Sequence, residues 1–142
     1  MPYQLEFRTS HDYDPGKSGI NVPVTLRFGE VSVALNAKVD TGASYCIFQR
    51  LYGEHLGLDI ERGHHQLLGT PTGSFVVYGH SVGLSVLEFE FDAVVYFAAD
   101  DSFRRVVLGR HGWLNRIQLG IVDYKGKLYL DGLEQEETDP LG

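Results

Sequence analysis

Apolar and polar residues alternate along much of the chain with a period of two, which is typical of half-buried β-strands. The clearest run covers residues 31–39, where every odd position is apolar. The same alternation predicts strands over 20–28, 82–86 and 89–97, and a shorter run predicts a first strand over 3–8. Pro23 lacks a backbone N–H, so it predicts a strand edge or an outward-facing position.

Glycine marks the connections between these strands. Gly29-Glu30 is a two-residue link with glycine first, which predicts a type II′ hairpin. The stretches 64–68 and 74–78 bracket a segment bounded by glycines, 69–73, and predict a second hairpin. A third hairpin is expected about Lys125-Gly126, and the continuous apolar run 106–108 predicts a buried strand.

Helical patterns are confined to two short segments. Residues 49–56 place apolar side chains near helical spacing, and Gly57 is well placed as the C-terminal stop. Residues 110–116 predict one or two helical turns, weakened by Gly112, with Trp113 and Leu114 as core contacts. We therefore predict a mostly β fold with one or two short helices.

Composition supports that prediction and narrows the function. The 142 residues include 17 glycines, 8 tyrosines and 8 phenylalanines, which favour strands and turns. We expect one domain over 1–132 and an acidic, flexible tail over 133–142. Twelve basic residues against nineteen acidic ones give a net charge of -7, which argues against partners such as nucleic acids or anionic membranes.

The sequence also suggests a compartment. Cys46 is the single cysteine, so no internal disulfide is expected and a reducing compartment is the simplest interpretation. No apolar run suits a membrane span or a signal peptide. We therefore expect a cytoplasmic protein with no membrane partner.

The candidate chemistry lies directly after the strand 31–39. The sequence Val39-Asp40-Thr41-Gly42-Ala43-Ser44 places a carboxylate in a tight turn between that strand and the apolar run 45–48. A carboxylate held between two buried segments is a candidate acid/base. The simpler alternative is an ordinary turn in which Asp40 caps backbone N–H groups.

This turn resembles the active-site loop of the retropepsin-like aspartic proteases, the single-domain class that includes the retroviral proteases. A second segment, Val106-Val107-Leu108-Gly109-Arg110, resembles the apolar-apolar-Gly-Arg segment that packs beside the catalytic loop in that family. Both segments occur in the family's order. The resemblance implies a small closed β-barrel of the retropepsin type.

The resemblance implies an aspartic endopeptidase that uses no metal or organic cofactor. Such enzymes share one proton between two facing carboxylates, one of which activates a water. This chain has a single Asp-Thr-Gly, so the resemblance implies a homodimer with its two-fold axis between paired Asp40 side chains. Asp40 is then the acid/base, Thr41 braces the two loops, and Gly42 gives the substrate backbone room.

The resemblance also assigns supporting positions. Ala43 and Ser44 would line the floor of a cleft for a peptide or protein substrate, and Leu108, Gly109 and Arg110 would support the loop. In retroviral members that arginine pairs with an acid at the position of Ser44, so Arg110 needs a different partner here. A flap over the substrate would come from the segment Gly69, Thr70, Pro71, Thr72 and Gly73.

Other reactive residues have simpler interpretations. His64 and His65 are adjacent on a predicted strand, so their side chains point to opposite faces and form no recognisable metal site. Cys46 lies within an apolar run and is expected in the core. Two other functions stay open: a catalytically silent retropepsin-fold module that binds peptides or dimerises, and an unrelated small β-barrel binding module.

Overall fold

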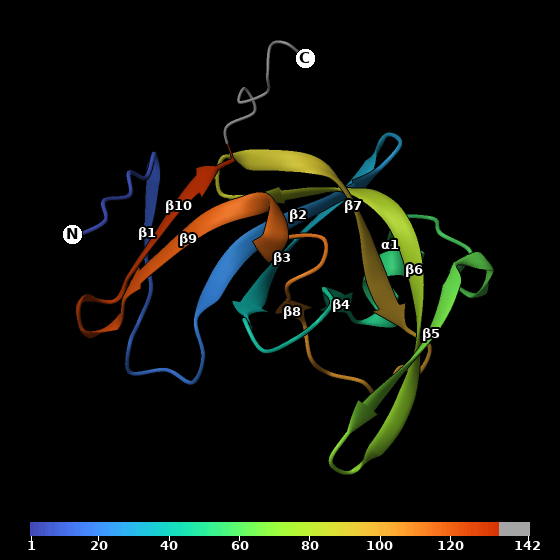
Figure 1. The fold of residues 1–142 in the computed structure, drawn as a ribbon. Coiled ribbons are helices and arrows are strands. Elements are labelled where there is room, and N and C mark those ends of the chain that lie inside the picture. The colour runs from blue at the N-terminus through green and yellow to red at the C-terminus, as the bar shows by residue number, and fades with distance from the viewer. Residues whose placement is uncertain (134–142) are drawn as a thin grey trace.

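The computed structural model describes residues 1–133 and consists mainly of β-strands (Figure 1). The mostly β fold expected from the sequence is confirmed. The helical segments are α1 (Arg50–His55) and the 3₁₀ turns η1 (Ile60–Arg62), η2 (Leu114–Arg116) and η3 (Asp123–Lys125). The strands are β1 (Thr9–Asp12), β2 (Asn21–Phe28), β3 (Val31–Val39), β4 (Ile47–Phe48), β5 (His64–Thr70), β6 (Gly73–Val86), β7 (Phe89–Ala98), β8 (Val107–Leu108), β9 (Ile117–Val122) and β10 (Lys127–Gly132).

The larger sheet returns to its own first strand. Its order is β2-β3-β8-β4-β7-β6-β5, and β2 pairs a second time with β6. The pairings therefore close into a ring, from which the end of the β5–β6 hairpin projects (Figure 1). The two short strands β4 and β8 are members of this ring, paired with each other between β3 and β7. Strand β3 runs parallel to β8 where the candidate loop begins.

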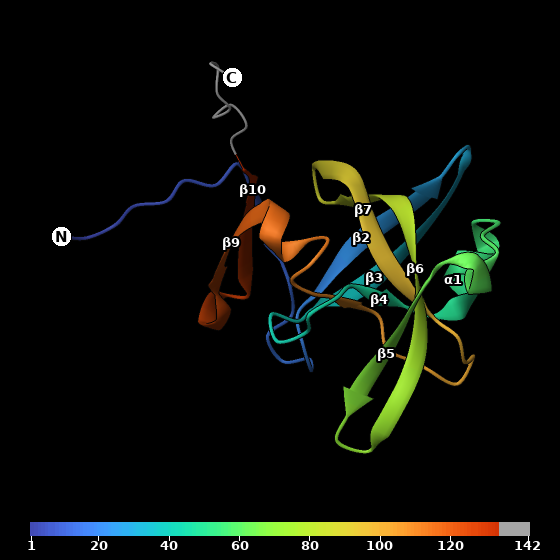
Figure 2. The same cartoon turned by 45° about the vertical axis from the view of Figure 1, so that its right-hand side comes forward.

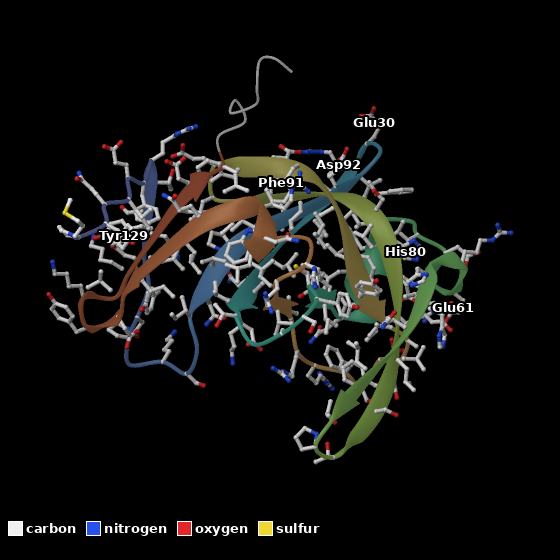
Figure 3. The ribbon with its side chains drawn as sticks, in the orientation of Figure 1. Glu30, Glu61, His80, Phe91, Asp92 and Tyr129 are labelled. Atoms are coloured by element: carbon white, nitrogen blue, oxygen red, sulfur yellow. The ribbon has the colours of Figure 1, made fainter. Side chains whose placement is uncertain are left out.

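A second sheet lies at one end of the ring and joins the two ends of the described chain. Its order is β1-β10-β9, with antiparallel pairing throughout. Leu128 and Leu130 of β10 are fully buried and belong to the same core cluster as Leu26 and Leu84 of the ring. The small sheet is therefore packed on the ring through a shared core, and Tyr129 lies on this sheet in Figure 3.

The strands bury the residues that alternation predicted. On β2, Val22, Val24 and Leu26 are at most 2% exposed, while Pro23 is exposed next to the point where pairing with β6 begins. The prediction of a strand edge or an outward-facing position for Pro23 is thus confirmed. The buried strand predicted near 106–108 is also present as β8.

The predicted connections agree with the structure at three hairpins and one helix. Gly29 has φ +62°, and Glu30 is not among the residues with positive φ, which is the sign pattern of a type II′ turn. Helix α1 matches the predicted segment, and the Gly57 N–H donates to the Glu54 carbonyl at its end. The hairpins β5–β6 and β9–β10 form as predicted.

The first predicted strand is wrong in position. Residues 1–7 have no regular structure, and Tyr3 and Leu5 are 97% and 63% exposed. Strand β1 instead covers Thr9–Asp12, because β10 pairs with those residues. Lys127 Nζ also lies 2.6 Å from Asp12 Oδ1. Alternation alone does not make a strand where no neighbour is present to pair with it.

The helix predicted over 110–116 is mostly absent. Only Leu114–Arg116 forms a single 3₁₀ turn, because Gly112 has φ +100° and interrupts any right-handed helix before it. Trp113 is 1% exposed, so its predicted place in the core is confirmed.

Two further sequence expectations concern the C-terminal tail and membrane-spanning segments. The acidic tail predicted for 133–142 lies outside the described residues except for Leu133. Within residues 1–133, no helix is both long and apolar enough to cross a membrane.

Candidate active site

Asp40 stands at the end of β3, held by its backbone to the neighbouring β8. The Asp40 N–H donates to the Leu108 carbonyl at 3.0 Å, and the Ala43 N–H closes the turn by donating to the Asp40 carbonyl at 3.1 Å. Parallel pairing of Val39 with Leu108 continues into this contact. We call residues 40–45 the floor loop.

The floor loop lies directly against Gly109. The Arg110 N–H donates to the Ala43 carbonyl at 2.9 Å, and the His111 N–H donates to the Ser44 carbonyl at 2.8 Å. A Cβ added to Gly109 would stand 2.3 Å from the Tyr45 carbonyl oxygen. The two segments singled out in the sequence are therefore neighbours, and a residue with a side chain at position 109 would force them apart.

Cys46 is fully buried beneath this junction. The Gly109 N–H donates to its Sγ at 3.4 Å, and the Sγ lies 3.7 Å from the His111 carbonyl oxygen. Burial raises the pKa of the Cys46 thiol to about 11, so the thiol is neutral at ordinary pH. The prediction that Cys46 is a core residue is confirmed.

The Asp40 carboxylate is partly exposed, with 33% of its side chain accessible. Its Oδ1 accepts the Gly42 N–H at 3.0 Å, which is the capping bond expected of an ordinary turn. Its Oδ2 lies 3.5 Å from Nη2 of Arg105, an ion pair with two thirds of the arginine side chain in solvent. Capping thus occupies Oδ1 and the ion pair with Arg105 involves Oδ2, while the carboxylate as a whole borders an open space.

That open space is a cavity of about 410 Å³ between the floor loop and the end of the β5–β6 hairpin. We call residues 69–73 the hairpin tip. Figure 2 shows the hairpin extending away from the ring. The lining residues are Asp40, Gly42, Ala43, Ser44, Tyr45, Ile47, Leu68, Gly69, Thr70, Pro71, Phe75, Phe103, Arg105 and Val107.

Most of the residues singled out in the sequence meet at this cavity, but some do not. Its lining leaves out Thr41, which is exposed, and Thr72 and Gly73 at the far side of the hairpin tip. Leu108 and Gly109 are buried behind the floor loop. Arg110 is exposed and forms no side-chain hydrogen bond or ion pair within residues 1–133, so the partner expected for it is not found there.

Sequence reasoning missed the aromatic walls and the cation of the cavity. The rings of Phe75 and Phe103 stack with centroids 4.7 Å apart, and those of Tyr45 and Tyr96 lie 4.9 Å apart. Phe75 lies in a strand of alternating pattern, so the face of the sheet on which its side chain lies could have been predicted from the sequence. Phe103 and Arg105 lie in a charged loop whose pattern contains no signal for the cavity.

Two of the histidines make local contacts. The His65 ring lies edge-on to Tyr78 at 5.5 Å, and the His80 Nε2 is 2.9 Å from the Ile60 carbonyl oxygen. Among residues 1–133, no group of three or more His, Cys, Asp or Glu side chains has the arrangement of a metal site.

Comparison with known proteins assigns no family to this chain. No protein-family model matches the chain, and no curated protein matches it. One similar solved structure is the EIAV protease complexed with the inhibitor HBY-793. The two chains are 18% identical with a TM-score of 0.49, over 78% of this chain and 88% of that one.

Proposed function

We propose that this chain is an aspartic endopeptidase in which two copies pair and their Asp40 carboxylates activate a water. The observation that carries the proposal is the position of Asp40: a partly exposed carboxylate in the wall of a 410 Å³ cavity that a hairpin faces from the other side. The ring of strand pairings supports the closed barrel that the resemblance implies.

The chemistry requires a second carboxylate that one chain does not provide. Asp40 is the one acidic residue in the lining of the cavity, as far as residues 1–133 are concerned. Hydrolysis of an unactivated amide by this route needs a base to take a proton from water and an acid to protonate the leaving nitrogen. A symmetric dimer would supply both from the same residue, and the exposed Thr41 beside Asp40 would then face the partner's loop.

In the proposed reaction the two Asp40 carboxyl groups hold one proton between them. The ionised carboxylate takes a proton from the water while the water oxygen attacks the scissile carbonyl carbon. The protonated partner carboxyl group donates a hydrogen bond to the carbonyl oxygen. The tetrahedral intermediate collapses as the amide nitrogen receives a proton from the carboxyl pair. The C–N bond breaks, and one proton again remains on the pair.

The cavity can hold a substrate in an extended conformation. The backbone beside Gly42 lies at its floor, and Thr70 and Pro71 of the hairpin tip lie opposite. A peptide strand between them would pair with main chain on both sides, as in strand addition to a sheet edge. The stacked rings of Phe75 and Phe103 would offer apolar contact to its side chains.

The direct test is cleavage of a diverse peptide mixture from acidic to neutral pH, with products identified by mass spectrometry. Asp40→Asn keeps the shape of the side chain but cannot act as a base, so cleavage should fall at least about a thousandfold. The matched control is Glu30→Gln, which removes one carboxylate at the tip of the β2–β3 hairpin, away from the cavity (Figure 3). Equal activity in wild type and Asp40→Asn would exclude Asp40 as the catalyst.

The pairing of two copies is tested separately by sedimentation at micromolar concentration, with and without a transition-state peptide inhibitor. We expect a dimer at least in the presence of the inhibitor, because inhibitor contacts to both copies add to the interface. A protein that stays monomeric in both conditions would remove the basis of the shared site.

A catalytically silent peptide-binding module is the second candidate. The observation that favours it is the Arg105 guanidinium 3.5 Å from Asp40 Oδ2, since a cation there competes for the carboxylate. This candidate predicts peptide binding without cleavage by a confirmed dimer. A cytoplasmic setting is part of both candidates and rests on the sequence alone.

A further inference from the structure

A second cavity, of about 260 Å³, adjoins the first along Arg105. It lies beside the paired strands β3 and β8 and the loop that leads into β8. Its lining residues are Asn21, Asn36, Lys38, Arg104, Arg105, Val106 and Val107. The lining therefore combines three cations with two side-chain amides, and it contains no acidic residue within the described part of the chain.

Three cations line this one cavity in a protein of net charge -7. Several other basic side chains have acidic partners: Arg27 Nη1 is 3.0 Å from Glu90, and Arg50 Nη1 is 2.7 Å from Glu61. Lys38 and Arg104 have none among residues 1–133. Like charges gathered at one place repel one another, and a bound anion would offset that repulsion.

The backbones that carry two of these cations are held by hydrogen bonds. The Lys38 N–H donates to the Val106 carbonyl at 3.0 Å, and the aliphatic part of Lys38 lies over Gly19, where a Cβ would stand 2.7 Å from its Cδ. The Arg104 carbonyl accepts a bond from Gln49 Nε2 at 2.6 Å. Both residues are therefore attached to fixed points of the fold.

Arg105 connects this cavity to the Asp40 cleft because it lines both. Its guanidinium is 3.5 Å from the Asp40 carboxylate. A substrate side chain that entered the basic cavity would thus pass Arg105, the residue that the cavity shares with the Asp40 cleft. Arg105 could then exchange its long contact with Asp40 for the carboxylate of the substrate.

We propose that the cavity lined by Lys38, Arg104 and Arg105 is a subsite for an acidic side chain, so that the preferred substrates carry Glu or Asp beside the scissile bond. The inference rests on the proposed peptidase function and specifies its substrate class. Glutamate and glutamine have the same shape, so a preference between them reports the charge of the subsite alone.

The test uses paired peptides that differ only in Glu or Gln beside the cleaved bond. Wild-type protein should cleave the Glu peptide about tenfold faster in kcat/KM, as expected for charge-assisted bonds that are partly exposed to solvent. Arg104→Glu should abolish this preference and improve cleavage of a matched Lys peptide. Lys125→Glu makes the same charge change in the η3 turn, outside the cavity, and should leave the tenfold ratio intact.

Binding separates this inference from the proposed function. The affinities of fluorescent Glu and Gln peptides for the full-length Asp40→Asn protein are measured by anisotropy at low and high salt. Tenfold tighter binding of the Glu peptide, reduced by salt and by Arg104→Glu, supports the subsite even if no peptide is ever cleaved. Cleavage without any Glu preference overturns the subsite and leaves the peptidase function standing, and equal binding of the two peptides also overturns it.

Discussion

The two walls of the Asp40 cavity are built differently. The floor loop is hydrogen-bonded to β8 through the backbone of Asp40 and to the segment after β8 through the carbonyls of Ala43 and Ser44, and it packs directly against Gly109. The hairpin tip has regular pairing between β5 and β6, but a Cβ on Gly69 or Gly73 would meet nothing within 4 Å. The floor loop is fixed by tertiary contacts, whereas the hairpin tip, residues 69–73, is held by the pairing of its own two strands.

This difference suits the proposed chemistry. A carboxylate that exchanges protons must be held in one geometry, and packed backbone does so without further reorganisation. A wall that admits a peptide must open, and hairpins with few tertiary contacts open at low cost in free energy. The packing of the two walls therefore agrees with a rigid floor loop and a movable hairpin tip.

The largest effect is expected at the rigid wall. Gly109→Ala would place a methyl group 2.3 Å from the Tyr45 carbonyl oxygen and 2.7 Å from that of Ala43. Because both neighbours are backbone atoms, we expect the free energy of unfolding to fall by about 3 kcal/mol or more. Urea denaturation followed by circular dichroism measures the loss. A loss below about 1 kcal/mol would show that the floor loop can shift easily.

A smaller effect concerns the buried thiol beneath the same wall. The pKa of Cys46 rises from 9.0 to about 11 on folding, so above pH 9 the unfolded chain loses this proton while the folded chain keeps it. The unfolded state then binds fewer protons, and the free energy of unfolding falls as pH rises from 9 to 11. Between pH 8.5 and 10.5 this contribution is about 1–2 kcal/mol.

Cys46→Ala tests that contribution because it has no thiol to ionise. The variant should be less stable at neutral pH, since the Gly109 N–H loses its sulfur acceptor. Its further loss of stability between pH 8.5 and 10.5 should nevertheless be about 1–2 kcal/mol smaller than that of wild type. Parallel pH profiles from urea denaturation would contradict the assignment.

The smallest effect is expected at the hairpin tip. Gly69→Ala adds a methyl group where nothing lies within 4 Å, at a residue whose φ is not positive. We expect the free energy of unfolding to change by no more than about 0.5 kcal/mol, because open space accepts the methyl and the unfolded chain loses some freedom. It is also the matched control for Gly109→Ala. A loss above about 1 kcal/mol would mean that the tip is packed against the body.

Several elements could be predicted because their causes are local. The type II′ turn at Gly29 depends on one glycine in a two-residue link, and α1 ends where Gly57 follows it. The burial of β2 follows from alternation once one face is covered. The candidate loop at Asp40 was found because a strand, a carboxylate and a glycine are consecutive in the chain.

Other features depend on neighbours that are distant in sequence. Residues 3–8 alternate as well as β2 does, yet the strand forms at Thr9–Asp12, because β10 pairs there. Arg105 reaches Asp40 across 65 positions, and Phe103 meets Phe75 in the cavity wall. No local pattern in a charged loop distinguishes these side chains from solvated ones.

By itself, the sequence determined the mostly β fold, the hairpins and the segment that carries Asp40, since these follow from side-chain period and backbone preferences within a few residues. Only the tertiary structure decided how closely Gly109 packs on the floor loop, which side chains line the cavity below the hairpin tip, and that Lys38, Arg104 and Arg105 line a second cavity next to it. Those arrangements depend on which strands become neighbours when the ring of pairings closes, and strand pairing is set by packing over the whole chain.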